Sequence, residues 1–211
     1  MDLTGAGIYG GKGVYRVADF QRAVEGMLPE GRILSHDLID GALAGTGYVG
    51  DVALFDGCPA TLSGWMKRQH RWTRGDWQLL PLIFSRKRSL RATDRFRMLD
   101  NLMRSLRAPA LWLLMMTSAW TGRAEGAAAG MLYLFLNAFL RPTDPDNWRR
   151  GLIGLATLPL TARRMADAAL RALWRVFVSH RRLMDWVPSA DAERSPEREG
   201  RGDGVDRKSV V

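Results

Sequence analysis

Residues 108–122, APALWLLMMTSAWTG, and residues 126–140, GAAAGMLYLFLNAFL, decide what kind of fold this chain can adopt. Each run holds 15 residues without a charge, and only Arg123, Ala124 and Glu125 separate the two. A helix that is apolar on every face belongs in a large core or in lipid, and a bilayer core asks for about 20 apolar residues. Aromatic residues and arginines lie at the ends of both runs, where interfacial anchors belong. We therefore expect membrane-embedded helices here.

The segments on either side of the apolar runs are amphipathic. Apolar residues at helical spacing predict helices over residues 17–26, 33–44, 62–84 and 93–107, with Ser35 as the N-cap of the second. After a loop at 141–150, residues 151–162 are apolar, and residues 163–186 carry an apolar stripe with arginines elsewhere, as an interfacial helix does. Residues 48–55, YVGDVALF, alternate like a strand, and residues 189–211 resemble a disordered tail.

The composition restricts the class of partner. The chain has 211 residues, with 31 basic and 22 acidic side chains, a net charge of +9 and one cysteine. A single cysteine excludes a disulfide framework and a cysteine-rich metal site. The three histidines are far apart in the sequence, which argues against a histidine-centred metal site. An excess of positive charge favours anions, namely nucleic acid, acidic lipid headgroups or phosphorylated substrates.

The densest group of chemically useful side chains is QHRWTRGDWQ, residues 69–78. Tryptophan rings stack on the apolar faces of sugars or bases, and arginine binds phosphate through two parallel hydrogen bonds. The same residues also fit an ordinary amphipathic helix with tryptophan in the core and arginine in solvent. Both interpretations are open on the residues alone.

The string Gln69-His70-Arg71-Trp72 resembles the Gln-x-x-Arg-Trp signature of processive, membrane-embedded family 2-type glycosyltransferases. The wider string QHRWTRGDWQLLP, residues 69–81, is similar to the glycosyltransferase module of cyclic β-1,2-glucan synthases. Further strings follow the order of that family, and the resemblance covers nearly all of residues 7–193. These strings are GKGVY at 11–15, LPE at 28–30, ILSHDL at 33–38, MLDNL at 98–102, LWR at 173–175 and SHRR at 179–182.

The resemblance implies a mainly α chain, the C-terminal acceptor part of a GT-A α/β glycosyltransferase domain followed by membrane-embedded and interfacial helices. Residues 1–107 would be the partial GT-A domain, residues 108–188 the membrane and interfacial helices, and residues 189–211 the tail. The implied reaction transfers glucose from UDP-glucose to a growing β-1,2-glucan with inversion. Asp37 occupies the position of the general base, a role that suits a carboxylate within reach of a hydroxyl. It also fits a first-turn residue favoured by the helix dipole.

The same resemblance implies the substrate-binding residues. Trp72 would stack on the acceptor sugar, Arg71 would neutralise the diphosphate leaving group, and Gln69 would hydrogen-bond sugar hydroxyls. Arg74 and Asp76 of the same string are assigned to substrate binding as well. Lys12, in the glycine-rich segment, would contact phosphate, although a surface position explains it equally well.

The sequence departs from the family at its N-terminal end. Residues 1–30 offer no Asp-x-Asp motif that could hold a divalent metal on the UDP diphosphate, and Arg16 stands where the family has Asp. Mg²⁺ or Mn²⁺ is therefore expected for the complete enzyme, with ligands outside this chain. We expect that residues 1–211 alone do not bind UDP-glucose productively and need the upstream catalytic portion as a partner.

The implied location is the bacterial inner (cytoplasmic) membrane, in a multi-pass arrangement with residues 1–107 facing the cytoplasm. Another processive β-glucan or polysaccharide synthase is the nearest alternative, because the motifs are shared across that group. A small basic protein that binds nucleic acid or membranes without catalysis is an alternative of a different class. The arginines flank the apolar runs instead of forming one basic face, so we expect the lipid bilayer, and not nucleic acid, as a partner. An inert remnant of a longer gene is a further alternative.

Overall fold

The computed structural model describes residues 7–11, 13–29, 31–55, 57–85 and 90–185. These residues form seven α-helices and a short π-helix, and no strand forms among them. The mainly α prediction is confirmed. The helices are α1 (Val17–Val24), α2 (Asp37–Ala44), α3 (Leu62–Gln78), α4 (Leu80–Ile83), α5 (Ala92–Thr121), α6 (Ala124–Leu140) and α7 (Pro145–Trp174), followed by η1 (Arg175–Ser179).

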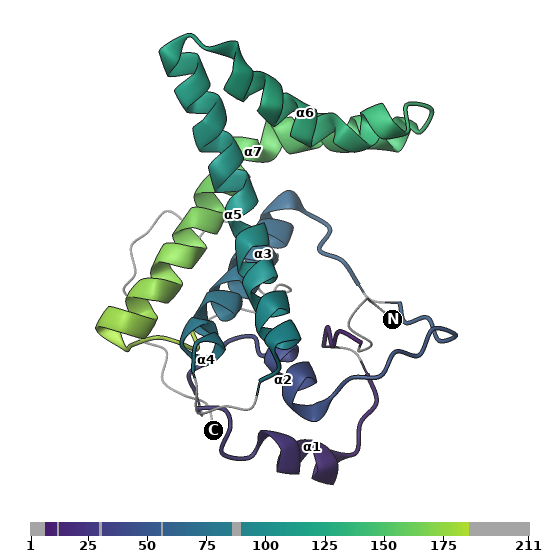
Figure 1. Ribbon diagram of the computed structural model, residues 1–211, viewed down its shortest axis with the longest axis vertical. Helices are drawn as coiled ribbons and strands as arrows, with labels where there is room; N and C mark the ends of the chain where they lie inside the picture. Colours follow the sequence, from purple (N-terminus) through teal and green to yellow (C-terminus); the bar gives the residue numbers. More distant parts are fainter. Residues whose placement is uncertain (1–6, 12, 30, 56, 86–89, 186–211) are drawn as a thin grey trace.

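The helices form two regions, which Figure 1 shows one above the other. The base consists of the described parts of residues 7–107 together with residues 160–185, so it contains α1 to α4 and the ends of α5 and α7 that lie beside α3. The arm consists of residues 108–159, in which the second half of α5 leads to α6 and the first half of α7 returns along α6. Because α5 and α7 each run through both regions, the arm is joined to the base by two continuous helices.

The core lies in the base. Ile39 of α2, Leu79 and Ile83 around α4, and Leu102 of α5 are the largest fully buried side chains. Trp77 of α3 and Ala172 of α7 belong to the same cluster. Helices α2, α3, α5 and α7 therefore share one apolar centre, and this centre fixes the end of α3 that carries the QHRWTRGDWQ string.

Local sequence explains where the longer helices begin. The Thr61 hydroxyl accepts a hydrogen bond from the Gly64 amide at 3.0 Å and so caps α3. The Asp144 carboxylate does the same for the Asp146 amide at 3.0 Å, with Pro145 in the first turn of α7. The loop predicted at 141–150 is therefore wrong in its second half, because these capping signals start α7 inside it.

Helix α5 merges two segments that the sequence separates. The amphipathic helix predicted at 93–107 and the apolar run at 108–122 form one helix of 30 residues, with Pro109 in its interior. Proline removes one backbone hydrogen bond and usually kinks or ends a helix. Here the helix continues to Thr121 and ends at Gly122, whose left-handed φ of 67° closes it.

Among the described residues, no helix combines the length and the apolar content needed to cross a membrane. Helix α6 has 17 residues, fewer than the roughly 20 that a bilayer core needs. The first half of α5 is charged, which leaves residues 108–121 as its apolar part, shorter still than α6. The membrane-spanning helices expected at 108–122 and 126–140 are therefore not supported, although both segments are helical.

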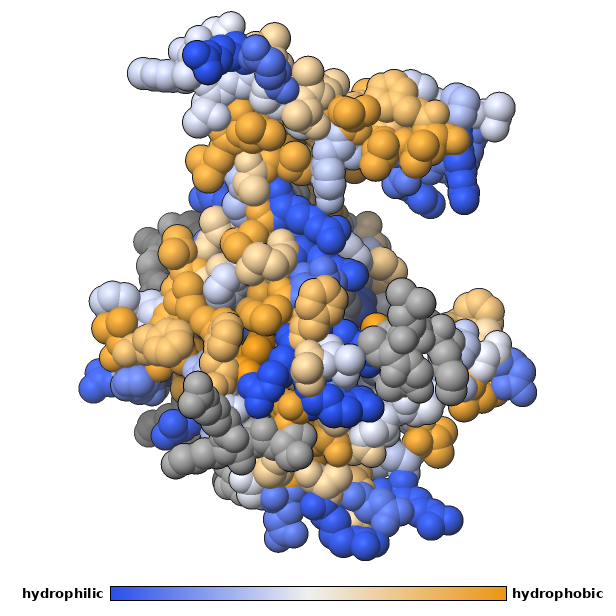
Figure 2. All heavy atoms as spheres, in the orientation of Figure 1, coloured by the Kyte–Doolittle hydropathy of each residue, from blue (hydrophilic) through white to orange (hydrophobic). Residues whose placement is uncertain are grey.

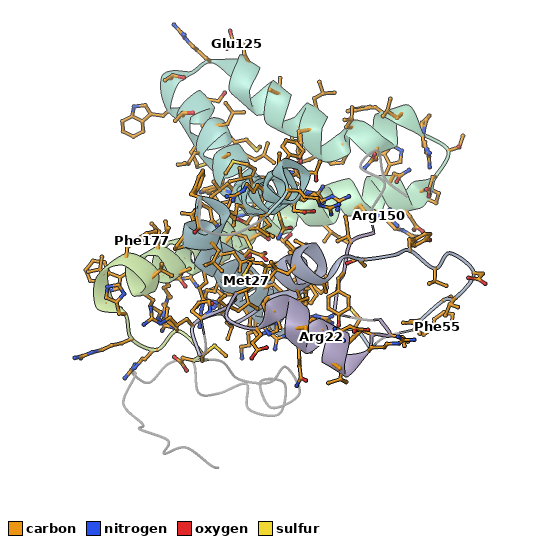
Figure 3. The ribbon with its side chains drawn as sticks, turned by 60° about the horizontal axis from the view of Figure 1, so that its bottom comes forward. Arg22, Met27, Phe55, Glu125, Arg150 and Phe177 are labelled. Carbon is orange, nitrogen blue, oxygen red and sulfur yellow. The ribbon has the colours of Figure 1, made fainter. Side chains whose placement is uncertain are left out.

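Two smaller expectations are also wrong. Residues 48–55 form neither strand nor helix and lie exposed between α2 and α3, with Phe55 at the outer edge of that loop (Figure 3). Alternation alone does not make a strand, because a strand needs a neighbour to pair with. Ser35 does not cap α2 either: the N-cap residue is His36, whose side chain makes no capping hydrogen bond to a backbone amide and instead contacts the Asp40 carboxylate. The predicted tail at 189–211 lies outside the described residues.

Candidate active site

A cavity of about 540 Å³ lies where α2, α3, α5 and α7 meet. Its volume falls within the range of roughly 300–1,000 Å³ that is usual for small-molecule sites. The wall is made by residues from five parts of the chain. They are Ile8, Tyr9 and Gly10; Ser35, Asp37 and Leu38; Gln69, Trp72, Thr73 and Asp76; Asn101, Arg104, Ser105, Arg107 and Ala108; and Thr161 and Met165.

Helix α3 contributes one continuous face to this wall. Gln69, Trp72, Thr73 and Asp76 are spaced three and four residues apart, so their side chains lie on the same side of the helix. Three of the predicted substrate-binding residues, Gln69, Trp72 and Asp76, thus line one cavity. They share it with Asp37, the predicted general base.

Two glycines bring Asp37 to that cavity. A Cβ atom on Gly75 would lie 2.5 Å from Cβ and 2.7 Å from the backbone N of Ser35, so only glycine lets α3 approach the segment before α2 this closely. On the opposite side, a Cβ on Gly11 would lie 3.1 Å from Oδ2 of Asp37, and Gly11 has a left-handed φ of 81°. Ser35, two residues before Asp37, is therefore packed against α3, and the Asp37 carboxyl lies beside Gly11.

Burial raises the pKa of Asp37 above its ordinary value. The charge of Asp40 acts in the same direction, whereas His36 and Arg71 act against it. A carboxyl group with a raised pKa is a stronger base once it has ionised. The half-buried position of Asp37 thus suits the acceptance of a proton from a bound hydroxyl group.

Burial has a larger effect on Asp76, whose pKa rises to about 7. The charge of Asp37 adds to this rise, and a hydrogen bond from the side chain of Asn101 opposes it. The cavity therefore contains two carboxyl groups of different proton affinity. Such a difference between neighbouring acids is a feature of catalytic sites.

Other residues of the string point away from the cavity and hold α3 in place. Arg74 is buried and donates a hydrogen bond to the carbonyl of Asp185 at 2.6 Å. Gln78 accepts a hydrogen bond from the Leu34 amide at 2.7 Å and donates one to the Leu183 carbonyl at 2.9 Å. Arg74, predicted to bind substrate, does not line the cavity and instead fastens the chain that follows η1.

Arg71 also lies outside the cavity wall, although its charge acts on Asp37. The spacing between Gln69 and Arg71 also differs from that of the Gln-x-x-Arg-Trp signature. The signature has two residues between Gln and Arg, whereas His70 alone separates Gln69 from Arg71, so Arg68 stands at the distance where the signature has Gln. The guanidinium carbon of Arg68 lies 4.4 Å from the centre of the Trp72 ring, a cation–π contact that supports Trp72.

Sequence reasoning missed the contact that joins α3 to α7. His70 Nε2 lies 2.8 Å from Oδ2 of Asp167, and Oδ1 of Asp167 accepts a hydrogen bond from Nε of Arg171 at 2.8 Å. His70 and Asp167 are 97 residues apart, so no local pattern predicts the pair. Desolvation lowers the pKa of His70, although the Asp167 carboxylate opposes that shift.

The remaining predicted positions concern phosphate and metal. Lys12 lies outside the described residues. Within the described part of the chain, no group of three or more His, Cys, Asp or Glu side chains is arranged to hold a metal ion. Cys58 is exposed and unpaired with another cysteine.

Comparison with known proteins supports the family resemblance of the sequence motifs. No protein-family model matches the chain. The chain is 34% identical over 220 aligned residues to the cyclic β-(1,2)-glucan synthase NdvB of Rhizobium meliloti (strain 1021). The match covers 92% of this chain and 8% of that protein, so the chain spans less than a tenth of the length of its relative. The resemblance stated from the motifs is confirmed.

Proposed function

The chain is related over nearly its whole length to one segment of a cyclic β-(1,2)-glucan synthase, and from that premise we propose that it forms the acceptor side of a glucosyltransferase site. The proposed reaction transfers glucose from UDP-glucose to a growing β-1,2-glucan with inversion. The remaining parts of such a site, including those that bind the nucleotide, would belong to sequence outside residues 1–211.

The observation that supports this proposal best is the shared cavity. Asp37 lies on α2, whereas Gln69 and Trp72 lie on α3, at least 32 positions later in the sequence. All three residues nevertheless line one cavity of about 540 Å³. An aromatic ring, an amide and a carboxylate around one cavity are the groups that a sugar needs: a flat apolar surface, hydrogen bonds to hydroxyls and a proton acceptor.

The proposed chemistry is a single displacement. The acceptor hydroxyl oxygen attacks the anomeric carbon of the donor glucose, its proton passes to the Asp37 carboxylate, and UDP leaves with the electrons of the broken C–O bond. Inversion follows because attack and departure occur on opposite faces of the sugar. Arg71 supplies positive charge near Asp37 in this scheme and favours the ionised form of the carboxylate that accepts the proton.

A divalent metal ion fits this cavity poorly. The wall contains only two carboxyl groups, and within the described part of the chain no group of three or more His, Cys, Asp or Glu side chains is arranged to hold a metal ion. Mg²⁺ or Mn²⁺, if the complete enzyme uses one, would therefore be held by residues outside this chain. No step of the proposed mechanism depends on a metal bound here.

The test is a chimera in which this chain replaces the matched segment of NdvB. Incorporation of labelled glucose from UDP-glucose into β-1,2-glucan is expected, and Asp37→Asn in the chimera should abolish it. Asp19→Asn provides the matched control, because Asp19 is an exposed α1 carboxylate, 2.6 Å from Arg22 and outside the cavity. Synthesis that survives Asp37→Asn at the level of the Asp19→Asn control would exclude Asp37 as the base.

A further inference from the structure

We infer that Asp76 takes part in sugar binding as a neutral carboxylic acid, which donates a hydrogen bond to the acceptor sugar while Asp37 accepts one. The inference rests on the proposed function, because it requires the acceptor to occupy the cavity. It assigns the two carboxyl groups opposite tasks: the α3 carboxyl orients the sugar, and the α2 carboxyl removes its proton.

The first support is the fixed geometry of the two helices. Asp76 directly follows Gly75, and Gly75 packs against Ser35, two residues before Asp37. Because the contact at Gly75 involves backbone on both sides, α3 and the start of α2 cannot separate without losing it. Asp37 and Asp76 therefore face the same cavity from adjoining walls, and a sugar held against Trp72 has both carboxyl groups around it.

The second support comes from the groups around Asp76. Helix α2 presents the Asp37 carboxyl to the cavity, and α5 presents the Asn101 amide with Arg104 and Arg107 further along the wall. Helix α7 presents only the uncharged Thr161 and Met165 within the described part of the cavity, and Tyr9 adds a phenol. Of these groups, Asp37 disfavours the ionised form of Asp76, and the Asn101 hydrogen bond is too weak to offset burial.

The difference in proton affinity between Asp37 and Asp76 indicates which carboxyl donates a hydrogen bond and which accepts a proton. The pKa of Asp76 reaches about 7. The charge of Asp37 contributes to the proton affinity of Asp76, as expected if Asp37 ionises first. Below that pH Asp76 carries a proton and can donate to a sugar oxygen. Above it the ionised form cannot donate, and it also adds a second negative charge beside Asp37.

Isothermal titration calorimetry of the 211-residue chain with a β-1,2-linked glucose disaccharide tests this without any need for catalysis. The wild-type chain should bind about tenfold more tightly at pH 6 than at pH 8.5, a factor that corresponds to the loss of one hydrogen bond to a buried group. Asp76→Asn retains a neutral donor of the same size, so its affinity should equal that of the wild type at pH 6 and stay unchanged at pH 8.5. Asp76→Ala should bind weakly at both pH values.

The inference is overturned if Asp76→Asn binds as weakly as Asp76→Ala at pH 6, if the wild type binds equally at both pH values, or if the wild type does not bind the disaccharide. Asp19→Asn should follow the wild type throughout, and circular dichroism confirms that each variant is folded. Failure of the proposed function is distinguishable. Disaccharide binding with the expected pH dependence, combined with a chimera that makes no glucan, would reject the transferase role and leave the assignment of Asp76 intact.

Discussion

The base and the arm are both helical, yet they pack by different means. In the base, large side chains such as Ile39 and Leu102 are no more than 1% exposed. In the arm many large apolar side chains are exposed, Trp120 by 91% and Leu140 by 70%, although Phe135 and Leu158 are buried, and the apolar surface over this region is visible in Figure 2. The arm helices instead approach one another at small residues, with Gly151 against the Phe135 ring and Gly130 against Met115. The candidate site lies almost entirely in the base.

The largest expected effect concerns Asp76, because its ionised form is destabilised by burial in the folded chain. Its folded-state pKa of about 7 exceeds the ordinary value of 3.8, so the folded state binds the proton more tightly. The stability of the wild type should therefore fall as the pH rises from about 4 to about 7, by up to about 4 kcal/mol at roughly 1.4 kcal/mol per pKa unit. Asp76→Asn removes this dependence.

Urea denaturation at pH 4 and pH 7 measures the effect, with Asp19→Asn as the control that should keep the wild-type slope. Parallel pH dependences of the wild type and Asp76→Asn would show that the proton on Asp76 is not linked to folding.

The second prediction compares the two kinds of packing directly. Ile39→Ala removes a fully buried side chain from the base and should lower the free energy of unfolding by about 3 kcal/mol, through lost burial and the cavity left behind. Leu152→Ala in the arm, where the side chain is exposed, should change it by less than about 0.5 kcal/mol. Equal losses in chemical denaturation would contradict the contrast between base and arm.

The third prediction uses one glycine from each region. Both Gly75→Ala and Gly151→Ala place a Cβ atom 2.5 Å from a neighbour, but the neighbour is Ser35, including its backbone, for Gly75 and the edge of the Phe135 ring for Gly151. A ring can turn aside more easily than backbone can move. We expect a loss of about 2 kcal/mol for Gly75→Ala, within the range for overpacked sites, and about 1 kcal/mol or less for Gly151→Ala.

In the chimera, Gly75→Ala should also reduce glucan synthesis, because it displaces Asp37, whereas Gly151→Ala should not. The comparison fails if Gly151→Ala is the more damaging of the two in thermal unfolding and synthesis.

The smallest expected effect belongs to Trp120. Its side chain is almost fully exposed at the end of α5, so Trp120→Ser should change the free energy of unfolding by less than about 0.5 kcal/mol. Chemical denaturation followed by circular dichroism measures it. A loss above 1 kcal/mol would mean that the outer surface of the arm contributes to the folded chain.

Local patterns predicted most of the helices and four of the residues that line the cavity, namely Asp37, Gln69, Trp72 and Asp76. The spacing of Gln69, Trp72 and Asp76 already places them on one helix face, and the helix at 126–140 lies within two residues of α6. What the local sequence did not predict depends on an interaction partner that is distant in the sequence or missing. Residues 48–55 have no strand to pair with among the described residues. Arg74 finds its acceptor 111 positions away, at Asp185, a contact that no local pattern predicts.

The two hydrogen bonds of the Gln78 side chain affect the order in which the chain folds during translation. Its amide joins Leu34, 44 positions earlier, to Leu183, 105 positions later. When α3 leaves the ribosome, only the earlier partner has been made, and at about 5–20 residues per second the later one follows after some seconds. During that interval the second wall of the cavity, which α7 provides, does not exist. A high sequence separation of this kind slows closure of the final structure, so the site is assembled last although its motif is translated early.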